Sequence, residues 1–201
     1  LGVDRRREQV LALLDDWVAD VTPGAVLYQP FISEAGERGP FIDANARAGF
    51  TGLSVQHGFE HFARAIFEGL CFAARDCYDT MGELPAEVVL SGGAARSQQL
   101  LSILSATLEA PLYTCKRDEA GAAGAAMMAA VSMGHYASMD DCVGEWVTPL
   151  LQQAVEPDAH LVERYRSLFP VYRSACTALQ PVWQAQATLR NNYRNNAGDT
   201  A

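Results

Sequence analysis

The residues best suited to binding a ligand lie at the end of an apolar stretch, in the sequence VVLSGGAARSQ from Val88 to Gln98. An apolar run that ends in two glycines and continues in polar residues predicts a strand, a tight turn and a helix. Because glycine has no Cβ, a ligand can approach the backbone at Gly92 and Gly93, and the following helix offers free N–H groups to an anion. The stretch matches neither the P-loop nor the GxGxxG pattern. The turn alone therefore leaves both a ligand site and a plain structural turn open.

A second candidate for chemistry is HGFEH, which matches the inverted zinc-protease pattern H-x-x-E-H. On a helix, His57 and His61 would share one face as zinc ligands, and Glu60 would be the general base. The same residue types are ordinary in the first turn of a helix, and a pattern with two free positions often matches by chance. We therefore expect no metal site in this chain and keep a zinc hydrolase as a lesser alternative.

A third candidate is the long irregular segment over residues 33–54, which is rich in glycine. It carries four charged residues, Glu37, Arg38, Asp43 and Arg47. A structureless loop of this length in a compact domain is usually functional or packed against another domain. A solvated loop and a loop folded over a cleft by Arg–carboxylate pairs remain equally open.

The elements that must position these residues follow from apolar periodicity and turn residues. They are helices over residues 4–20, 58–80, 96–109 and 118–134, strands over 25–32, 85–90 and 110–115, and one or two long helices over 157–190. The helix after residue 117 is expected to begin at Asp118 as N-cap and to end at Gly134. The alternation of helix and strand over 57–134 predicts parallel strands with right-handed crossovers. Pro170 and Pro181 are expected to break the last helix.

The composition limits the class of partner. The formal net charge is −9 over 201 residues, which argues against nucleic acids and anionic membranes as partners. The short basic cluster Arg5–Arg7 is expected to be the solvated face of the first helix. Five cysteines without a CxxC pair predict reduced thiols in a cytoplasmic protein, and no signal peptide or membrane-spanning segment is evident. Because the chain starts at Leu1, we expect a piece of a longer protein.

Four motifs in succession carry a resemblance to a known family. They are GERGPFIDANARAGFTGLS, HFARAIFEGLCFAARD, VVLSGGAARSQQLLSILSATLEAPLY and EAGAAGAAMMAA. Over roughly residues 25–135 this series resembles the C-terminal half of the FGGY carbohydrate kinases in both order and spacing. Within that family the chain looks most like the sugar-alcohol and ketopentose kinases, such as those for erythritol and xylulose.

The resemblance implies an α/β fold of the actin-like (ribonuclease H-like) ATPase class, in which two domains enclose a deep cleft. Residues 1–201 would be the C-terminal, nucleotide-binding domain with a helical tail over 157–201, and the N-terminal sugar-binding domain would be absent from this chain. The intact enzyme would use ATP and Mg²⁺ to phosphorylate a sugar or polyol hydroxyl of the pentulose or tetritol class. Its partners would be that substrate, its own N-terminal domain and, as is common in the family, a second copy in a homodimer.

Carried over to this sequence, the family's nucleotide motif falls on Gly92, Gly93, Ala94 and Ser97. The first three would line the adenine and ribose, and Ser97 takes the polar position beside them. The family's catalytic aspartate and its phosphate-binding hairpin lie upstream of the matched region, so we expect no catalytic residue in this chain. The alternative is a module of the actin-like superfamily that binds a nucleotide without catalysis, which fits the absence of those motifs.

Overall fold

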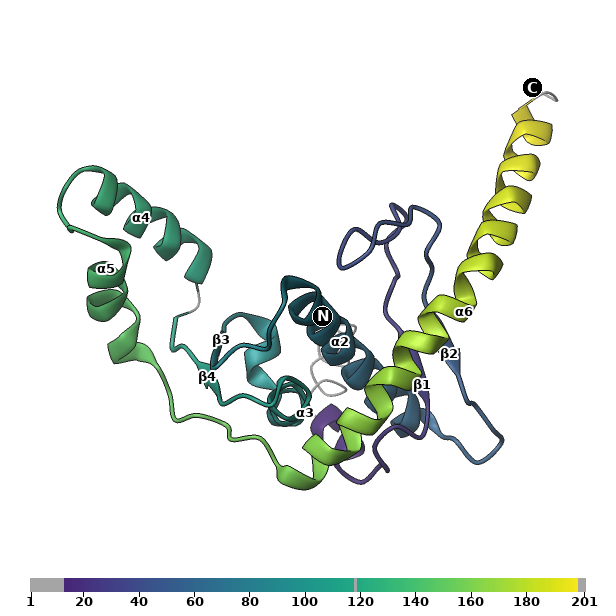
Figure 1. The fold of residues 1–201 in the computed structure, drawn as a ribbon, viewed down its shortest axis with the longest axis horizontal. Helices are drawn as coiled ribbons and strands as arrows, with labels where there is room; N and C mark the ends of the chain where they lie inside the picture. Colours follow the sequence, from purple (N-terminus) through teal and green to yellow (C-terminus); the bar gives the residue numbers. More distant parts are fainter. Residues whose placement is uncertain (1–12, 118, 199–201) are drawn as a thin grey trace, which may run out of the picture.

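The computed structural model describes residues 13–117 and 119–198. Residues 13–19 are helical. The labelled elements are β1 (Leu27–Gln29), β2 (Gly49–Thr51), α2 (Phe59–Met81), β3 (Val88–Leu90), η1 (Gly93–Arg96), α3 (Gln98–Leu108), β4 (Leu112–Thr114), α4 (Ala120–Ser132), α5 (Met139–Trp146), η2 (Thr148–Leu150) and α6 (Ala159–Gly198) (Figure 1).

The predicted alternation through the middle of the chain is confirmed by α2, β3, α3, β4 and α4. β3 and β4 pair in parallel, with Val88 beside Leu112. α4 ends as expected, since Gly134 adopts a φ of 77° two residues after the end of the helix. The expected N-cap Asp118 and the basic cluster Arg5–Arg7 lie outside the described residues.

The free edge of β4 is covered by residues 151–155, which return after α5 in an antiparallel direction. The N–H of Leu112 donates to the carbonyl of Val155 at 3.0 Å, and the N–H of Val155 donates back at 2.9 Å. The N–H of Lys116 donates to the carbonyl of Leu150 at 3.0 Å. This pairing, which the sequence did not predict, fixes the chain just beyond β4.

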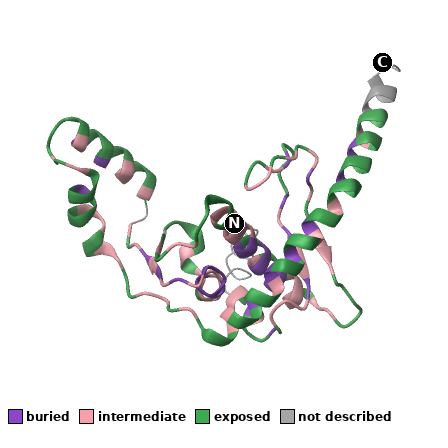
Figure 2. Cartoon of the chain, viewed as in Figure 1, coloured by how far each residue is buried: buried purple, intermediate pink, exposed green. Residues whose placement is uncertain are grey.

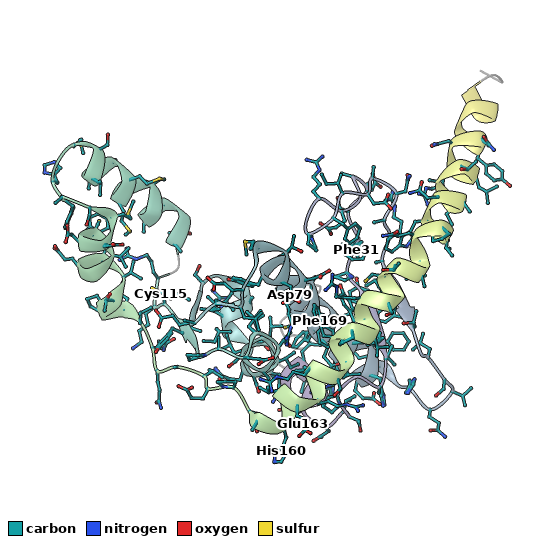
Figure 3. The ribbon with its side chains drawn as sticks, viewed as in Figure 1. Phe31, Asp79, Cys115, His160, Glu163 and Phe169 are labelled. Carbon is teal, nitrogen blue, oxygen red and sulfur yellow. The ribbon has the colours of Figure 1, made fainter. Side chains whose placement is uncertain are left out.

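The core lies where α2, α3 and α6 meet, and the buried residues gather there (Figure 2). At its centre the ring of Phe72 lies 5.5, 6.0 and 5.3 Å from the rings of Tyr165, Phe169 and Tyr172. Figure 3 labels Phe169 on α6 within this crowded region. Large aromatic side chains bury much apolar surface, so packing among helices supplies most of the core of this chain.

β1 lies directly against α2 because one position of the helix has no side chain. A Cβ on Gly69 would come within 2.3 Å of the carbonyl oxygen of Tyr28, so no other residue fits without moving the strand. β1 is shorter than the strand predicted over residues 25–32, and it pairs in an antiparallel manner with β2. The segment predicted to be irregular therefore contains a strand.

A buried polar cluster joins α2 to α6 and to the N-terminal part of the chain. Arg64 and Glu68 are 5% and 2% exposed, and their side chains pair at 2.7 Å. Arg64 also donates to the carbonyl of Val18 at 2.7 Å and to the hydroxyl of Tyr165 at 3.0 Å. That hydroxyl donates to Glu68 at 3.0 Å, and the N–H of Gly24 donates to the same carboxylate at 2.9 Å. Each charge is thus paired and hydrogen-bonded, as burial requires.

The C-terminal tail is one continuous helix of 40 residues, so the predicted breaks at Pro170 and Pro181 are wrong. Each proline removes one backbone donor, which frees the carbonyls of Arg166 and Thr177. Both prolines are exposed, and their spacing of eleven residues places them on one side of the helix. Water can therefore hydrate the freed carbonyls while the opposite face stays packed.

Within the described part of the chain, neither α6 nor any other helix is long and apolar enough to cross a membrane.

Glu109 joins α3 to the helices on either side of it. It follows the last residue of α3 with a φ of 58°, a left-handed conformation that is uncommon outside glycine. Its carboxylate accepts from Arg166 of α6 and, at 3.1 Å, from Arg75 of α2. The hydrogen bond from Arg166, together with the charge of Arg75, lowers the pKa of Glu109 below its usual value.

This lowered pKa predicts a pH-dependent contribution to stability. An acid whose pKa is lower in the folded state stabilises the fold above its unfolded pKa, about 4.3, and loses that contribution as the pH falls through the folded value. We expect Glu109→Gln to lower the urea midpoint at pH 7 and to match the parent protein near pH 3. Glu163→Gln, on the exposed side of α6, is the matched control and should differ at neither pH. A deficit for Glu109→Gln that is equal at both pH values would contradict the ion-pair explanation.

Candidate functional site

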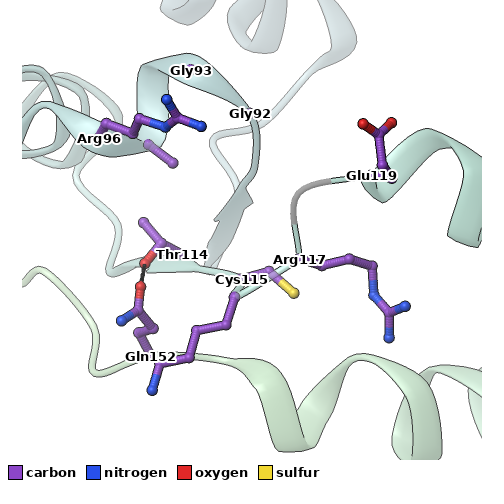
Figure 4. Close-up of a pocket in the computed structure, with 10 residues that line it drawn as sticks. Gly92, Gly93, Arg96, Thr114, Cys115, Arg117, Glu119 and Gln152 are labelled. Carbon is purple, nitrogen blue, oxygen red and sulfur yellow. Dashed lines mark hydrogen bonds between the residues drawn. The ribbon is translucent and has the colours of Figure 1, made fainter.

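A hollow of about 420 Å³ lies at the carboxyl ends of β3 and β4 (Figure 4). Ligands in α/β sheets bind at this end of parallel strands. The hollow is lined by Gly92, Gly93, Ala95, Arg96, Thr114, Cys115, Lys116, Arg117, Glu119 and Gln152. The Gly-Gly turn, the end of β4 and the segment that returns after α5 thus meet around one space.

The two glycines of the turn occupy different backbone environments, and only one of them requires glycine for its conformation. Gly92 has a φ of 84°, which side-chain-bearing residues rarely adopt, so the turn itself requires glycine there. Gly93 has no such φ, and a Cβ built on it would meet no described atom within 4 Å. Neither backbone strain nor packing inside the described chain explains glycine at position 93. The open space beside Gly93 is available to a ligand.

Of the four residues predicted to bind the nucleotide, two line the hollow and two do not. Ala94 and Ser97 lie outside its lining in the part of the chain that the structure describes. Ser97 caps α3, where its hydroxyl accepts from the N–H of Leu100 at 3.1 Å and donates to the carboxylate of Asp15. Its hydroxyl is therefore engaged within the fold. The nucleotide role of all four residues stays a prediction.

Hydrogen bonds join the segments that line the hollow. Thr114 at the end of β4 donates its hydroxyl to the amide oxygen of Gln152 at 2.8 Å, and the N–H of Gln152 donates to the carbonyl of Thr114 at 2.8 Å. The guanidinium of Arg117 donates to the carbonyl of Trp146 at 2.7 Å and extends away from Arg96 (Figure 4). Arg117 thus ties the site to α5.

The HGFEH stretch begins α2 and has the geometry of a helix start. The Nδ1 of His57 accepts from the N–H of Ser54 at 3.0 Å, and the Nδ1 of His61 accepts from the N–H of Gly58 at 3.1 Å. Both imidazoles therefore close local turns. Among the residues that the structure describes, no group of three His, Cys, Asp or Glu could hold a metal ion. These contacts favour the structural interpretation of the pattern over the zinc hydrolase.

The charged loop is held by backbone carbonyls. The guanidinium of Arg47 donates to the carbonyls of Glu34, Ala44 and Ala46 at 3.1, 3.1 and 2.6 Å. The carboxylate of Asp43 accepts from Gln184 of α6 at 3.3 Å. In the described residues no Arg–carboxylate pair forms within this loop, so the structure does not support the alternative in which such pairs hold it. The loop packs on α6.

The three basic residues that line the hollow, Arg96, Lys116 and Arg117, were not predicted from the sequence. Lys116 and Arg117 lie just after β4, beyond Cys115, and Arg96 is the last residue of η1, so all three lie in or beside elements that were predicted. Their proximity depends on the parallel pairing of β3 with β4. A basic dipeptide at the end of the second strand was the available signal.

The fold defines an α/β domain with a hollow at the carboxyl ends of its parallel strands. The model of the FGGY family of carbohydrate kinases, C-terminal domain, matches residues 3–133, and the chain belongs to this family. The expected actin-like ATPase fold is confirmed.

Similar proteins include named kinases. The chain is 57% identical over 175 residues to an erythritol kinase of Brucella abortus (strain 2308), covering 87% of this chain and 34% of that protein. It is 28% identical over 170 residues to a xylulose kinase of Bacillus subtilis (strain 168), covering 83% and 33%. The solved xylulose kinase from Rhodospirillum rubrum matches with a TM-score of 0.73 at 29% identity, covering 88% and 36% of the two chains. The chain spans about a third of the length of these relatives.

Proposed function

We propose that this chain is the nucleotide-binding part of a kinase that transfers a phosphoryl group from ATP to a hydroxyl of a sugar or polyol. The substrate class that we propose is a tetritol or a pentulose. The similarity to a protein named erythritol kinase and to several named xylulose kinases supports that class. The observation that carries the proposal is the hollow at the Gly-Gly turn in a chain of the FGGY family.

The residues around the hollow fit an adenine nucleotide. The backbone at Gly92 and Gly93 is open to a flat or sugar-like group, because a Cβ on either would meet no described atom. Arg96, Lys116 and Arg117 supply positive charge beside it. The described residues hold no three-ligand metal group, so we place Mg²⁺ on the phosphates of the nucleotide. Bound ATP would supply the phosphoryl group, and this chain's part is to hold and orient the nucleotide.

Catalysis would need the rest of the protein. We propose that an N-terminal domain binds the sugar or polyol whose hydroxyl attacks and supplies the general base. That domain would also be the main partner of this chain. Closure of two domains excludes water from a phosphoryl-transfer site. We further propose a cytoplasmic location, where ATP is available, and a homodimer, which light scattering of the full-length protein would test.

The proposed activity predicts a clear result with the full-length protein. We expect ADP release with erythritol or with xylulose in the presence of Mg-ATP, and much slower release without a polyol or sugar. A coupled assay for ADP, with mass spectrometry of the phosphorylated product, measures both. Tight ADP binding without transfer to any tetritol or pentulose would instead support the non-catalytic module. The absence of both nucleotide binding and transfer would contradict the proposal altogether.

A further inference from the structure

The hollow concentrates positive charge in an acidic chain. The chain carries a formal net charge of −9, and Lys116 is its single lysine. Lys116 lines the hollow together with Arg96 and Arg117, whereas Glu119 is the one acidic residue among the described residues of the lining. Positive side chains grouped beside an open backbone suit a ligand that carries negative charge.

Two of these three cations are available to a ligand. Arg117 is held by the carbonyl of Trp146. Arg96 is exposed, and among the described residues its guanidinium has no hydrogen bond or ion pair. Figure 4 shows the side chain of Arg96 extending along η1 toward the hollow. Lys116 is also exposed, and its backbone is fixed by the bond to Leu150.

Other arginines of the chain are engaged within the fold. Arg64, Arg75, Arg166 and Arg173 each pair with a carboxylate on a helix or at its end. Unlike these four arginines, Arg96 has no carboxylate partner among the described residues. A guanidinium held at the rim of a hollow without such a partner can form bidentate hydrogen bonds to phosphate oxygens.

We propose that Arg96 and Lys116 bind phosphate oxygens of the nucleotide and so make the site prefer ADP and ATP over adenosine. This inference rests on the proposed function. The adenosine part would lie against Gly92 and Gly93, and the phosphates would extend from the turn toward the end of β4. The two cations come from different segments that line the hollow, one from η1 and one just after β4, so they can bind oxygens of the same phosphate chain.

Calorimetric titration of the full-length protein with ADP and with adenosine tests this assignment. We expect Arg96→Ala and Lys116→Ala each to weaken ADP binding by about 10- to 100-fold, because each loses a charge-assisted hydrogen bond. Adenosine affinity should stay within about twofold, and Arg96→Lys should retain part of the affinity for ADP. Arg164→Ala, which removes an exposed arginine of α6, is the matched control and should change neither.

A second measurement does not depend on any variant. Because Lys116 is the single lysine of these 201 residues, acetylation followed by peptide mass mapping reports on it alone within this chain. ADP should shield Lys116 from acetylation, and adenosine should not.

The outcomes separate this inference from the proposed function. Equal loss of ADP and adenosine affinity in Arg96→Ala would overturn the phosphate assignment, as would shielding of Lys116 by adenosine. Unchanged ADP affinity in both variants, with binding still lost in Gly93→Val, would also overturn it while leaving the nucleotide site in place. Weakened binding of the phosphorylated sugar product, with ADP unaffected, would assign the cations to the product. No binding of ADP to the parent protein would overturn the inference and the proposed function together.

Discussion

Gly93→Val is expected to weaken Mg-ADP binding by at least about 100-fold while leaving the fold intact. The fold should tolerate the change because Gly93 needs no left-handed backbone and its missing Cβ faces no described atom. A ligand lying against the backbone at that position would instead collide with two methyl groups. Calorimetry of the full-length protein measures the affinity, and circular dichroism with the thermal midpoint checks the fold.

Gly144→Val is the matched control for this substitution. Gly144 lies in α5, and a Cβ there also meets no described atom within 4 Å. We expect the control to bind ADP as the parent protein does. If Gly93→Val bound ADP with unchanged affinity, the nucleotide would not lie at the Gly-Gly turn, whatever the kinase assay shows.

Glu68→Ala is expected to lower the free energy of unfolding by about 3 to 5 kcal/mol. The substitution leaves the buried guanidinium of Arg64 without its carboxylate, and it removes the acceptor for Tyr165 and for the N–H of Gly24. Since whole domains are stable by about 5 to 15 kcal/mol, a loss of this size threatens folding. Urea unfolding followed by near-ultraviolet circular dichroism, which reports on the aromatic core, measures the change.

A double variant separates the cost of an unpaired charge from the value of the pair. Arg64→Leu with Glu68→Leu removes both charges, so it should be less destabilised than Glu68→Ala alone. Glu163→Ala, near the start of α6 (Figure 3), controls for the loss of a surface carboxylate and should have little effect. A double variant as unstable as the sum of both single variants would contradict the role assigned to the buried pair.

The local elements could be predicted because their signals are local. The strand, Gly-Gly turn and capped helix around residues 88–108 follow from apolar runs, glycine and Ser97. α6 could not be predicted as one helix, because its opposite face is packed on both sides of the prolines: near Pro170 on α2 and α3, and near Pro181, through Trp183, on Phe31 and Phe41. Tertiary contact overrode a local preference there.

The residues of the candidate site could likewise be predicted only where their signal is local. Gly92 and Gly93 were evident from the turn, whereas Arg96 and Lys116 come together through strand pairing, which no short pattern records. The motif RAIFEG was recognised as a family feature without a physical reason. The structure supplies one, since Arg64 and Glu68 form the buried pair and Gly69 lets β1 approach α2.

The two prolines of α6 have a consequence for the order in which the chain folds. A helix interrupted twice in its hydrogen-bond ladder has little stability as an isolated peptide, so α6 becomes helical only on a surface that already exists. Yet Tyr165, Phe169 and Tyr172 of that helix complete the core around Phe72. During synthesis, the apolar surface of α2 and α3 that α6 covers therefore stays exposed until α6 has left the ribosome. In that interval the nascent chain is open to chaperones and to aggregation.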